Sequence, residues 1–484
     1  MGSGTKPLQT KAGKIVDEQG REVRLRGVCV GGWMNLENFI NGYPGSEHGL
    51  RAALTDAIGA SRTHFFFERL LDHMLSEQDL AFLKRLGCTG VRLPFNYRHF
   101  ESDDNPFVYH EAAFARLSQA LAWCEKNGLY AILDLHALPG WQNPDWHSDN
   151  GSRQALFWQN RHFQDRFVAL WEELARRYKG SATVAGYNVM NEPVTGAPRG
   201  RFSNNYRTDW APLNAIYRRV VGAIRAIDPD HIIFLEGDFY SLRFSGLDAP
   251  FADNLVYSSH NYNAGGFGPG SYPGLIGNDA WDAAKQTRSF EQNEGTAYSR
   301  QHRVPLWVGE FGSVYNGRPD EIPDRVRAMD DQLGVFESNA VHWTAWTYKD
   351  VGTMGWVMLK TESEYMQRVA RVLELKRTLG TDSWAGWLPS SEIAKLMDRA
   401  AEQAAEAIDD PELPFNEFAP YLKQAALDGF FGGLLQPVYA SAFKGLSETD
   451  IDRVLSSFAL DQCRENTPLL GVLRRRLDAA RAGL

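Results

Sequence analysis

Residues 90–136 have the sequence GVRLPFNYRHFESDDNPFVYHEAAFARLSQALAWCEKNGLYAILDLH and contain one complete strand–helix–strand unit. The apolar and β-branched runs Gly90–Phe95 and Tyr130–His136 are typical of buried strands, and Glu111–Asn127 between them has a helical pattern. Two strands that are joined by a helix usually lie parallel in one sheet. This stretch therefore predicts a parallel sheet that is covered by helices.

The same alternation of strand and helix continues along most of the chain. Eight strands are expected, at Arg24–Trp33, Gly90–Phe95, Tyr130–His136, Val184–Glu192, Ile232–Asp238, Leu255–Tyr262, Pro305–Gly312 and His342–Tyr348. Helices are expected at Ser76–Leu86 (with Ser76 and Asp79 as a capping box), Glu111–Asn127, Asn160–Lys179, Ala211–Ile227, Trp281–Gln301, Asp320–Asn339 and Glu362–Leu379. Eight repeats predict an α/β fold that closes as a (β/α)₈ TIM barrel. The alternative is an open doubly wound sheet, but its glycine fingerprint is missing after the first strand.

Four segments are expected in addition to the minimal barrel. Residues 1–12 are expected to be a disordered tail or a remnant of cloning, and residues 13–25 predict a β-hairpin. Within a barrel of residues 13–385, residues 35–75 form a helical insertion. Residues 386–484 form a C-terminal helical extension, with its first helix at Ser390–Ile408. The extension could pack on the barrel wall, cover its mouth, or pair two chains into a homo-oligomer.

The composition and the charge of the chain limit the classes of partner that we expect it to bind. The 484 residues have a formal charge of −9, which argues mildly against nucleic acid. The N-terminus shows no signal sequence and no apolar run is long enough to span a bilayer, so we expect a cytoplasmic protein with no membrane partner. Secretion stays open if a native leader has been removed. No H-E-x-x-H motif or phosphate-binding loop is found, so neither a metal nor another cofactor is expected.

Polar and aromatic residues gather at the predicted carboxyl ends of the strands, where barrel enzymes place their catalytic groups. Glu192 and Glu310 are 118 residues apart, on the fourth and seventh strands, which face each other across the mouth. Two facing carboxylates can cleave a glycosidic bond if their pKa values are split. Arg92 is the candidate to keep Glu310 ionised, and Glu192 is expected to stay protonated until it donates. The other candidates at strand ends are His136, Asn191, His260, Tyr262 and Trp346.

Five short motifs together resemble glycoside hydrolase family 5 of the clan A barrels. They are VRLPF at 91–95, NEP at 191–193, HNY at 260–262, GEFG at 309–312 and WTYKD at 346–350, and the resemblance extends from about Gly13 to Leu379. It implies a two-step retaining mechanism, with Glu192 as acid/base and Glu310 as nucleophile.

The resemblance also implies supporting roles. Arg92 and Tyr262 would hydrogen-bond Glu310, and His260 would contact Glu192. Asn191 would bind the sugar 2-hydroxyl, His136 would bond the same ring, and Trp346 would form the floor beneath it. A cis peptide is expected at Trp346-Thr347. The large aromatic residues Trp33, Trp141, Trp146 and Tyr348 could line further sugar sites, whereas Asn35, Glu37 and Lys349 are expected on the solvated surface.

These features favour a retaining β-glycoside hydrolase that acts on β-glucosides or short β-gluco-oligosaccharides from a closed pocket. The absence of a signal sequence and the position of the 35–75 insertion support the pocket. The alternative is a cellulase-type endo-β-1,4-glucanase with an open cleft. A transglycosylase and a non-catalytic sugar-binding barrel are minor alternatives.

Overall fold

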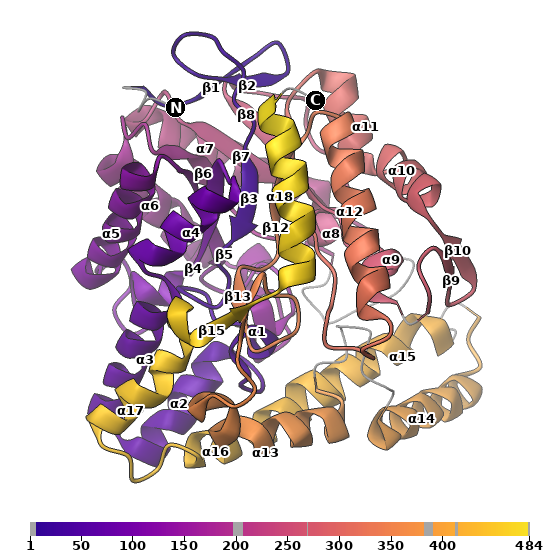
Figure 1. The fold of residues 1–484 in the computed structure, drawn as a ribbon. Coiled ribbons are helices and arrows are strands. Elements are labelled where there is room, and N and C mark those ends of the chain that lie inside the picture. Colours follow the sequence, from indigo (N-terminus) through magenta and orange to yellow (C-terminus); the bar gives the residue numbers. More distant parts are fainter. Residues whose placement is uncertain (1–5, 197–206, 269, 382–390, 412–414, 483–484) are drawn as a thin grey trace.

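The computed structural model in Figure 1 describes residues 6–196, 207–268, 270–381, 391–411 and 415–482. Eight strands form a closed barrel in the order β11-β12-β3-β4-β5-β6-β7-β8, and each pair in it is parallel. They are β3 (Arg26–Cys29), β4 (Gly90–Asn96), β5 (Tyr130–Ala137), β6 (Val184–Asn188), β7 (Ile232–Glu236), β8 (Leu255–His260), β11 (Leu306–Glu310) and β12 (His342–Ala345). The predicted (β/α)₈ barrel is confirmed.

A hairpin covers the amino-terminal end of the barrel, at the top of Figure 1. It pairs β1 (Gln9–Lys11) with β2 (Lys14–Val16), and its residues Leu8 and Ile15 pack against barrel residues such as Phe234 and Trp307. The hairpin thus begins earlier than expected, because β1 lies in the range expected to be a tail. Residues 1–5 of that range lie outside the described residues. Of the hairpin expected within residues 13–25, only a single antiparallel bridge between Val16 and Glu22 is present in the described residues.

Seven of the helices around the barrel lie where the sequence predicts them, with one interruption. They are α4 (Glu77–Leu86), α5 (Glu111–Asn127), α6 (Arg161–Tyr178), α7 (Trp210–Ile227), α10 (Ala283–Glu291), α11 (Glu294–His302) and α12 (Ile322–Ser338). The expected capping box is present, since the Ser76 N–H donates to Asp79 over 2.8 Å. The single helix expected at Trp281–Gln301 is divided in two, because the Asn293 side chain accepts from the Gly295 N–H and starts α11.

The eighth position in the helical ring is filled by an unexpected segment. The helix predicted there forms as α13 (Glu364–Leu379), but it packs against α14, α16 and α17 of the extension. The last helix, α18 (Thr467–Ala482), packs instead against both α12 and α4, the helices on either side of the eighth position. The strand before it, β15 (Cys463–Glu465), pairs with β14 (Val357–Leu359), which in turn pairs with β13 (Lys349–Asp350). A boundary near residue 385 therefore cuts through the barrel.

The insertion and the remainder of the extension lie together at the opposite end from the hairpin, at the bottom of Figure 1. The insertion contains α1 (Asn38–Asn41), α2 (Glu47–Ile58) and α3 (Ala60–Met74). The extension contains α14 (Glu392–Ile408), α15 (Phe415–Gln424), a π-helical turn η5 (Ala425–Phe431), α16 (Gly432–Ser441) and α17 (Glu448–Leu455). Gln436 of α16 donates to the carbonyl oxygens of Pro44 (3.1 Å) and Ser46 (2.9 Å), and α17 packs on α3.

Of the roles expected for the extension, the structure shows packing on the barrel by α18 and contact with the loop after β5 at the mouth by Gln424, whereas pairing of two chains stays a prediction. Among the described helices, none has both the length and the apolar character that a membrane span requires.

Candidate active site

Glu192 and Glu310 reach the mouth from β6 and β11 by different backbone routes. Glu310 is the last residue of β11. Strand β6 ends at Asn188, earlier than expected, and Glu192 follows with a φ of +47°, in the left-handed region that few side-chain-bearing residues adopt. This turn lets the adjacent Asn191 and Glu192 both contact the groups of the mouth. Such conformations are concentrated at functional sites.

The Glu310 carboxylate is held by two donors. Its Oε1 is paired with the guanidinium of Arg92, and its Oε2 accepts a 3.0 Å hydrogen bond from the Tyr262 hydroxyl. These are the contacts expected of Arg92 and Tyr262. Both donate to its oxygens, so they fix the orientation of the carboxylate at the mouth.

Arg92 is fully buried and lies among several acceptors. It pairs with Asp134 (3.1 Å) and Glu236 (3.3 Å) and donates to Asn191 Oδ1 (2.7 Å). Burial opposes its charge, but the carboxylates of Asp134 and Glu310 outweigh burial and keep the pKa of Arg92 well above its usual range. A buried cation of this kind is tolerated because it is fully paired.

Each oxygen of the Glu192 carboxylate contacts a histidine. Oε1 lies 2.6 Å from His260 Nδ1, as expected, and Oε2 lies 3.0 Å from His147 Nε2. Burial would raise the pKa of Glu192, but the two histidines outweigh it and hold that pKa well below its usual range. The expectation that Glu192 keeps its own proton is therefore wrong for the free protein. The proton belongs to a coupled cluster of Glu192 and the histidines.

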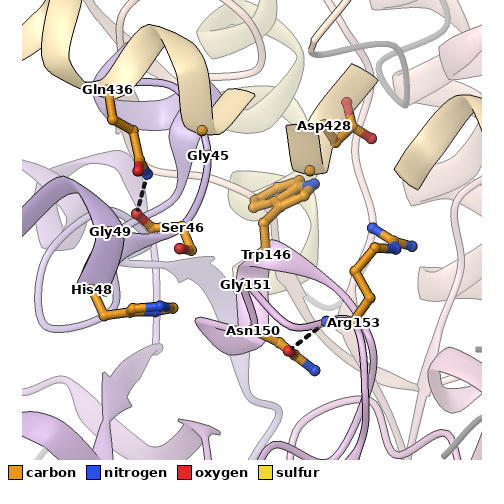
Figure 2. Close-up of a pocket in the computed structure, with 12 residues that line it drawn as sticks. Gly45, Ser46, His48, Gly49, Trp146, Asn150, Gly151, Arg153, Asp428 and Gln436 are labelled. Atoms are coloured by element: carbon orange, nitrogen blue, oxygen red, sulfur yellow. Dashed lines mark hydrogen bonds between the residues drawn. The ribbon is translucent and has the colours of Figure 1, made fainter. Parts of the chain in front are cut away.

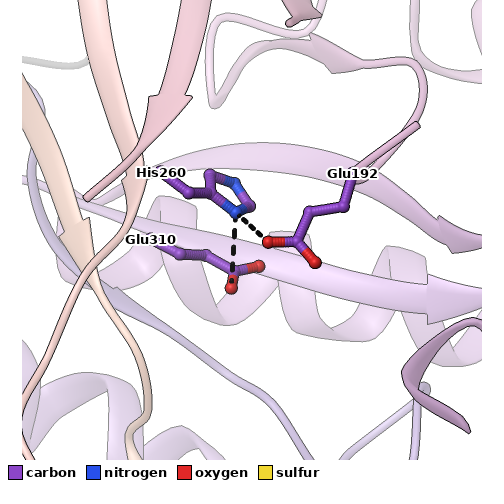
Figure 3. A group of neighbouring side chains, drawn as sticks. All are labelled: Glu192, His260 and Glu310. Atoms are coloured by element: carbon purple, nitrogen blue, oxygen red, sulfur yellow. Dashed lines mark hydrogen bonds and ion pairs between the residues drawn. The ribbon is translucent and has the colours of Figure 1, made fainter. Parts of the chain in front are cut away.

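His260 lies between the two carboxylates (Figure 3). Its Nδ1 is 2.6 Å from Glu192 and 3.6 Å from Glu310, and its Nε2 is 3.5 Å from Glu236. Burial opposes a charge on the ring, but the three carboxylates raise the pKa of His260 well above its usual range. Glu192, His260 and Glu310 could each offer one metal-ligand atom, and these atoms lie within 4.8 Å of one another. Because both carboxylates are already bound by protein cations, we interpret the cluster as paired ionisable groups.

His136 and Trp346 form a second layer of the site. The ring planes are 11° from parallel with centroids 5.2 Å apart, so one face of the indole is covered by the imidazole. His136 Nδ1 lies 2.7 Å from Asp134 and its Nε2 lies 3.3 Å from Glu37. Burial opposes a charge on His136, but Asp134 and its other neighbours raise its pKa to about 10. The Trp346-Thr347 bond is cis, as expected, and the role of Trp346 as a sugar floor stays a prediction.

Several residues lie elsewhere than expected. Tyr348 is fully buried and donates to Asp79 (2.8 Å), so it cannot line a sugar site. Lys349 is also buried and pairs with Asp79 over 2.8 Å. Asn35 and Glu37, expected in solvent, are 1 % and 3 % exposed, because the insertion folds back over the strand ends.

The remaining aromatic candidates for sugar contact differ in how far their side chains are exposed. Trp33 is buried and offers no open face, Trp146 is also buried, and Trp141 is partly exposed and stays a candidate for sugar contact.

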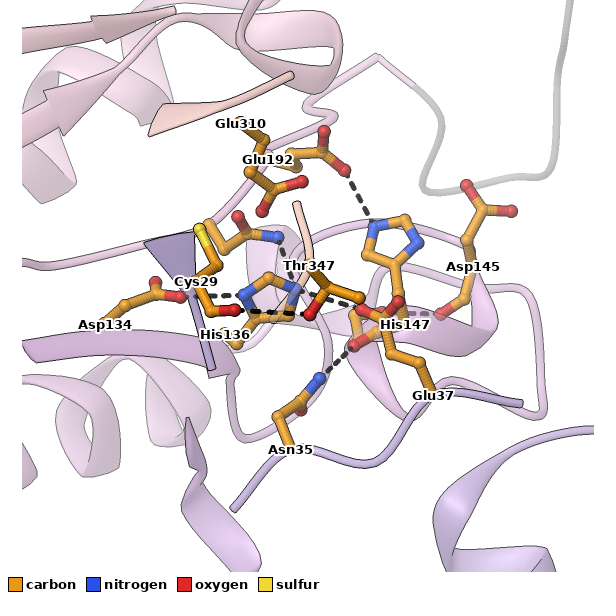
Figure 4. A network of polar contacts seen from close by, with 12 residues as sticks. Cys29, Asn35, Glu37, Asp134, His136, Asp145, His147, Glu192, Glu310 and Thr347 are labelled. Atoms are coloured by element: carbon orange, nitrogen blue, oxygen red, sulfur yellow. Dashed lines mark hydrogen bonds and ion pairs between the residues drawn. The ribbon is translucent and has the colours of Figure 1, made fainter. Parts of the chain in front are cut away.

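Glu236 and His147 are functional candidates that the sequence did not reveal. Glu236 is the last residue of β7, so it too lies at a strand end, where barrel enzymes place their catalytic groups. It accepts a 2.8 Å hydrogen bond from the Glu192 backbone N–H. His147 lies in the loop after β5 and not at a strand end, so its position could not be predicted in this way. Figure 4 shows it above His136, with its ring toward Glu192.

A cavity of about 230 Å³ lies beside the site, between the insertion, the loop after β5 and the extension (Figure 2). Trp146, Arg153, His48, Asp428 and Gln436 are among its lining residues, and neither catalytic candidate is. Glu192 and Glu310 are themselves only 8 % and 5 % exposed. The two carboxylates are therefore nearly buried themselves, and they do not line this cavity.

Comparison with known proteins places this geometry in context. The family model described as Cellulase (glycosyl hydrolase family 5) matches residues 58–352. A Beta-xylosidase from Phanerodontia chrysosporium is 37 % identical over 483 residues, which cover 96 % of this chain and 97 % of that protein. Endoglucanase C from Acetivibrio thermocellus is 24 % identical over 60 % of this chain and 88 % of its own length. Probable glucan 1,3-beta-glucosidase A from Aspergillus fumigatus is 24 % identical over 69 % of this chain and 85 % of its own length.

Proposed function

Because the chain belongs to glycosyl hydrolase family 5 and is a glycoside hydrolase, we propose that it is a retaining β-glycosidase that removes one terminal sugar from small β-xylosides or β-glucosides. The observation that carries this proposal is the spacing of Glu192 and Glu310, whose facing oxygens lie within 4.8 Å. Retaining enzymes separate their carboxyl groups by about 5–5.5 Å, and inverting enzymes by about 6.5–9.5 Å to admit a water.

In this mechanism ionised Glu310 attacks the anomeric carbon, while Glu192 protonates the departing oxygen. The C–O bond to the leaving group breaks as the bond to Glu310 forms. Glu192 then removes a proton from water, which attacks the anomeric carbon and releases Glu310. Arg92 and Tyr262 stabilise Glu310 each time it regains its charge.

The enclosure of the mouth supports action on small substrates. The insertion covers one side, where Glu37 contacts His136. On another side, Gln424 at the end of α15 donates to Asp145 in the loop after β5. The similarity to a Beta-xylosidase extends over this insertion and extension, whereas Endoglucanase C matches 60 % of the chain. A β-xyloside is accordingly the first substrate to test, and a β-glucoside is the second.

The test uses 4-nitrophenyl β-xyloside and β-glucoside with wild type, Glu310→Gln and the control Glu374→Gln on the exposed face of α13. We expect Glu310→Gln to lower kcat at least about 10⁴-fold with the fold intact, and Glu374→Gln to behave as wild type. A 2-deoxy-2-fluoro glycoside should add one sugar mass to the peptide that contains Glu310. Equal activity of Glu310→Gln and wild type, or an α-configured first product by NMR, would refute the proposal.

The mode of attack is measured separately on a β-1,4-glucan. We expect release of single sugars from oligosaccharide ends without an early fall in viscosity. A rapid fall in viscosity with little monosaccharide would instead identify an endoglucanase.

A further inference from the structure

His147 contacts the proposed acid/base from the side that His260 leaves free. Its Nε2 lies 3.0 Å from Glu192 Oε2, while His260 Nδ1 lies 2.6 Å from Oε1. The His147 side chain is 14 % exposed, so it is largely removed from bulk water. Each oxygen of one carboxylate therefore has its own imidazole, as Figure 4 shows for His147 and Figure 3 for His260.

Three separate parts of the chain hold His147 in this place. In its own loop, Trp146 packs edge-on to the ring at 5.5 Å, and Asn143 Oδ1 accepts a 3.0 Å hydrogen bond from the Asp145 N–H. From the insertion, Asn35 Nδ2 donates to the His147 carbonyl oxygen over 3.2 Å. From the extension, Gln424 donates to Asp145, two residues before His147. The loop that carries His147 is thus held from three parts of the chain, which places the ring beside Glu192 as a built part of the mouth.

We propose that His147 is a positioning residue that orients Glu192 and supplies it with the proton for the leaving group; this inference rests on the proposed function. The proton on His147 Nε2 moves to Glu192, and Glu192 delivers a proton to the departing oxygen as the glycosidic C–O bond breaks and Glu310 bonds the anomeric carbon. Glu192 is then ionised and His147 is neutral. In the second step ionised Glu192 removes a proton from the attacking water and passes it to His147 Nε2, which restores the starting charges.

The charges around His147 fit this role. Burial opposes a charge on its ring, but the carboxylates of Glu192, Asp145 and Glu37 outweigh burial and raise the pKa of His147. A carboxyl group alone has a pKa near 4.3 and loses its proton at lower pH than such an imidazole. The groups that face His147 and Glu192 from the surrounding elements are Glu37, His136, Asp145, Glu236, Tyr240, His260 and Glu310.

The test compares substrates that do and do not need the proton. The 2,4-dinitrophenolate of an aryl β-glycoside leaves without being protonated, whereas the methoxy group of a methyl β-glycoside must be protonated as it leaves. For His147→Gln we expect kcat/KM for the dinitrophenyl substrate to stay within about twofold of wild type. For the methyl substrate we expect a loss of at least about tenfold, and the basic limb of its pH profile should move about one unit lower. The Gln side chain can still donate a hydrogen bond to Oε2 but cannot take up and release a proton. The shift of the pH profile therefore distinguishes the supply of a proton to Glu192 from the positioning of Glu192 alone.

His48→Gln is the matched control. His48 also contacts the loop after β5, through Asp149 at 2.9 Å, but it does not touch Glu192. We expect wild-type values on both substrates and an unchanged pH profile. His147→Ala is the second variant, for which added imidazole should restore hydrolysis of the methyl substrate.

Two results would overturn this inference alone. An equal loss on both substrates in His147→Gln, with no pH shift, would indicate a structural role. No loss on either would show that His260 suffices. Wild type that cleaves neither substrate would refute the proposed function itself, and with it this inference.

Discussion

At the scale of single residues, His342 shows how burial outside the mouth links stability to pH. It begins β12, is 3 % exposed, and accepts a 3.1 Å hydrogen bond at Nδ1 from the Leu25 N–H, which requires an unprotonated Nδ1. Burial, with Arg24 and Arg26 nearby, lowers its pKa to about 3. In the unfolded chain its pKa is about 6.5, so below that pH the His342 side chain is protonated in the unfolded state but not in the folded state. The stabilisation is therefore complete above about pH 6.5 and falls away as the pH drops toward 3.

We predict that His342→Gln weakens this dependence on pH. Between about pH 7 and pH 5, wild type should lose up to about 2 kcal/mol more of its free energy of unfolding than the variant loses. Urea unfolding at the two pH values measures the difference. His162→Gln, on the exposed face of α6, should keep the wild-type dependence. Parallel behaviour of His342→Gln and wild type would contradict the prediction.

The placement of catalytic groups at strand ends predicts Glu192 and Glu310 from the sequence, because a barrel fixes where strand ends meet. Arg92 lies inside β4 and reaches Glu310 from there. The placement at strand ends does not predict His147 or Glu37, since both lie on loops whose path depends on distant segments. Glu37 is expected to be solvated because glutamate is rarely buried unless it is paired. In the structure it is buried, because the insertion that contains it folds over the mouth.

At the scale of elements, the identity of the eighth barrel helix is the main departure from expectation. Both α13 and α18 follow the last strand and both have an apolar face, so periodicity cannot choose between them. Chain order favours α13. The structure instead pairs β15 with β14, and this pairing brings the chain back to the barrel directly before α18.

We predict that α18 contributes to stability as a barrel helix does. Leu473 on α18 is fully buried, so Leu473→Ala should lower the free energy of unfolding by about 2–5 kcal/mol. Leu396 on α14 is 45 % exposed, and Leu396→Ala should cost no more than about 0.5 kcal/mol. Chemical denaturation of both variants gives the comparison. A cost for Leu473→Ala no larger than that for Leu396→Ala would place α18 outside the cooperative core.

At the scale of the whole molecule, the extension packs on the barrel through α18 and on the insertion through α16 and α17. The fold class follows from the alternation of strands and helices, which is local, but the domain boundary does not, because it depends on contacts between residues far apart in sequence. Residues 1–389 include all eight strands yet lack the helix that packs between α12 and α4. They also lack β15, the partner of β14, and Gln424, which holds the loop of His147.

We therefore predict that residues 1–389 do not fold alone and that co-expression with residues 390–484 restores both fold and activity. Without α18, the apolar side chains of α12 and α4 that it covers would meet water, and this exposure favours aggregation. Size-exclusion chromatography and hydrolysis of the aryl glycosides measure recovery, with the intact chain as reference. If the pieces associate, they should elute together, because α18 and β15 would regain their places on the barrel. A folded and fully active chain of residues 1–389 would instead show that the strands close the barrel without an eighth helix.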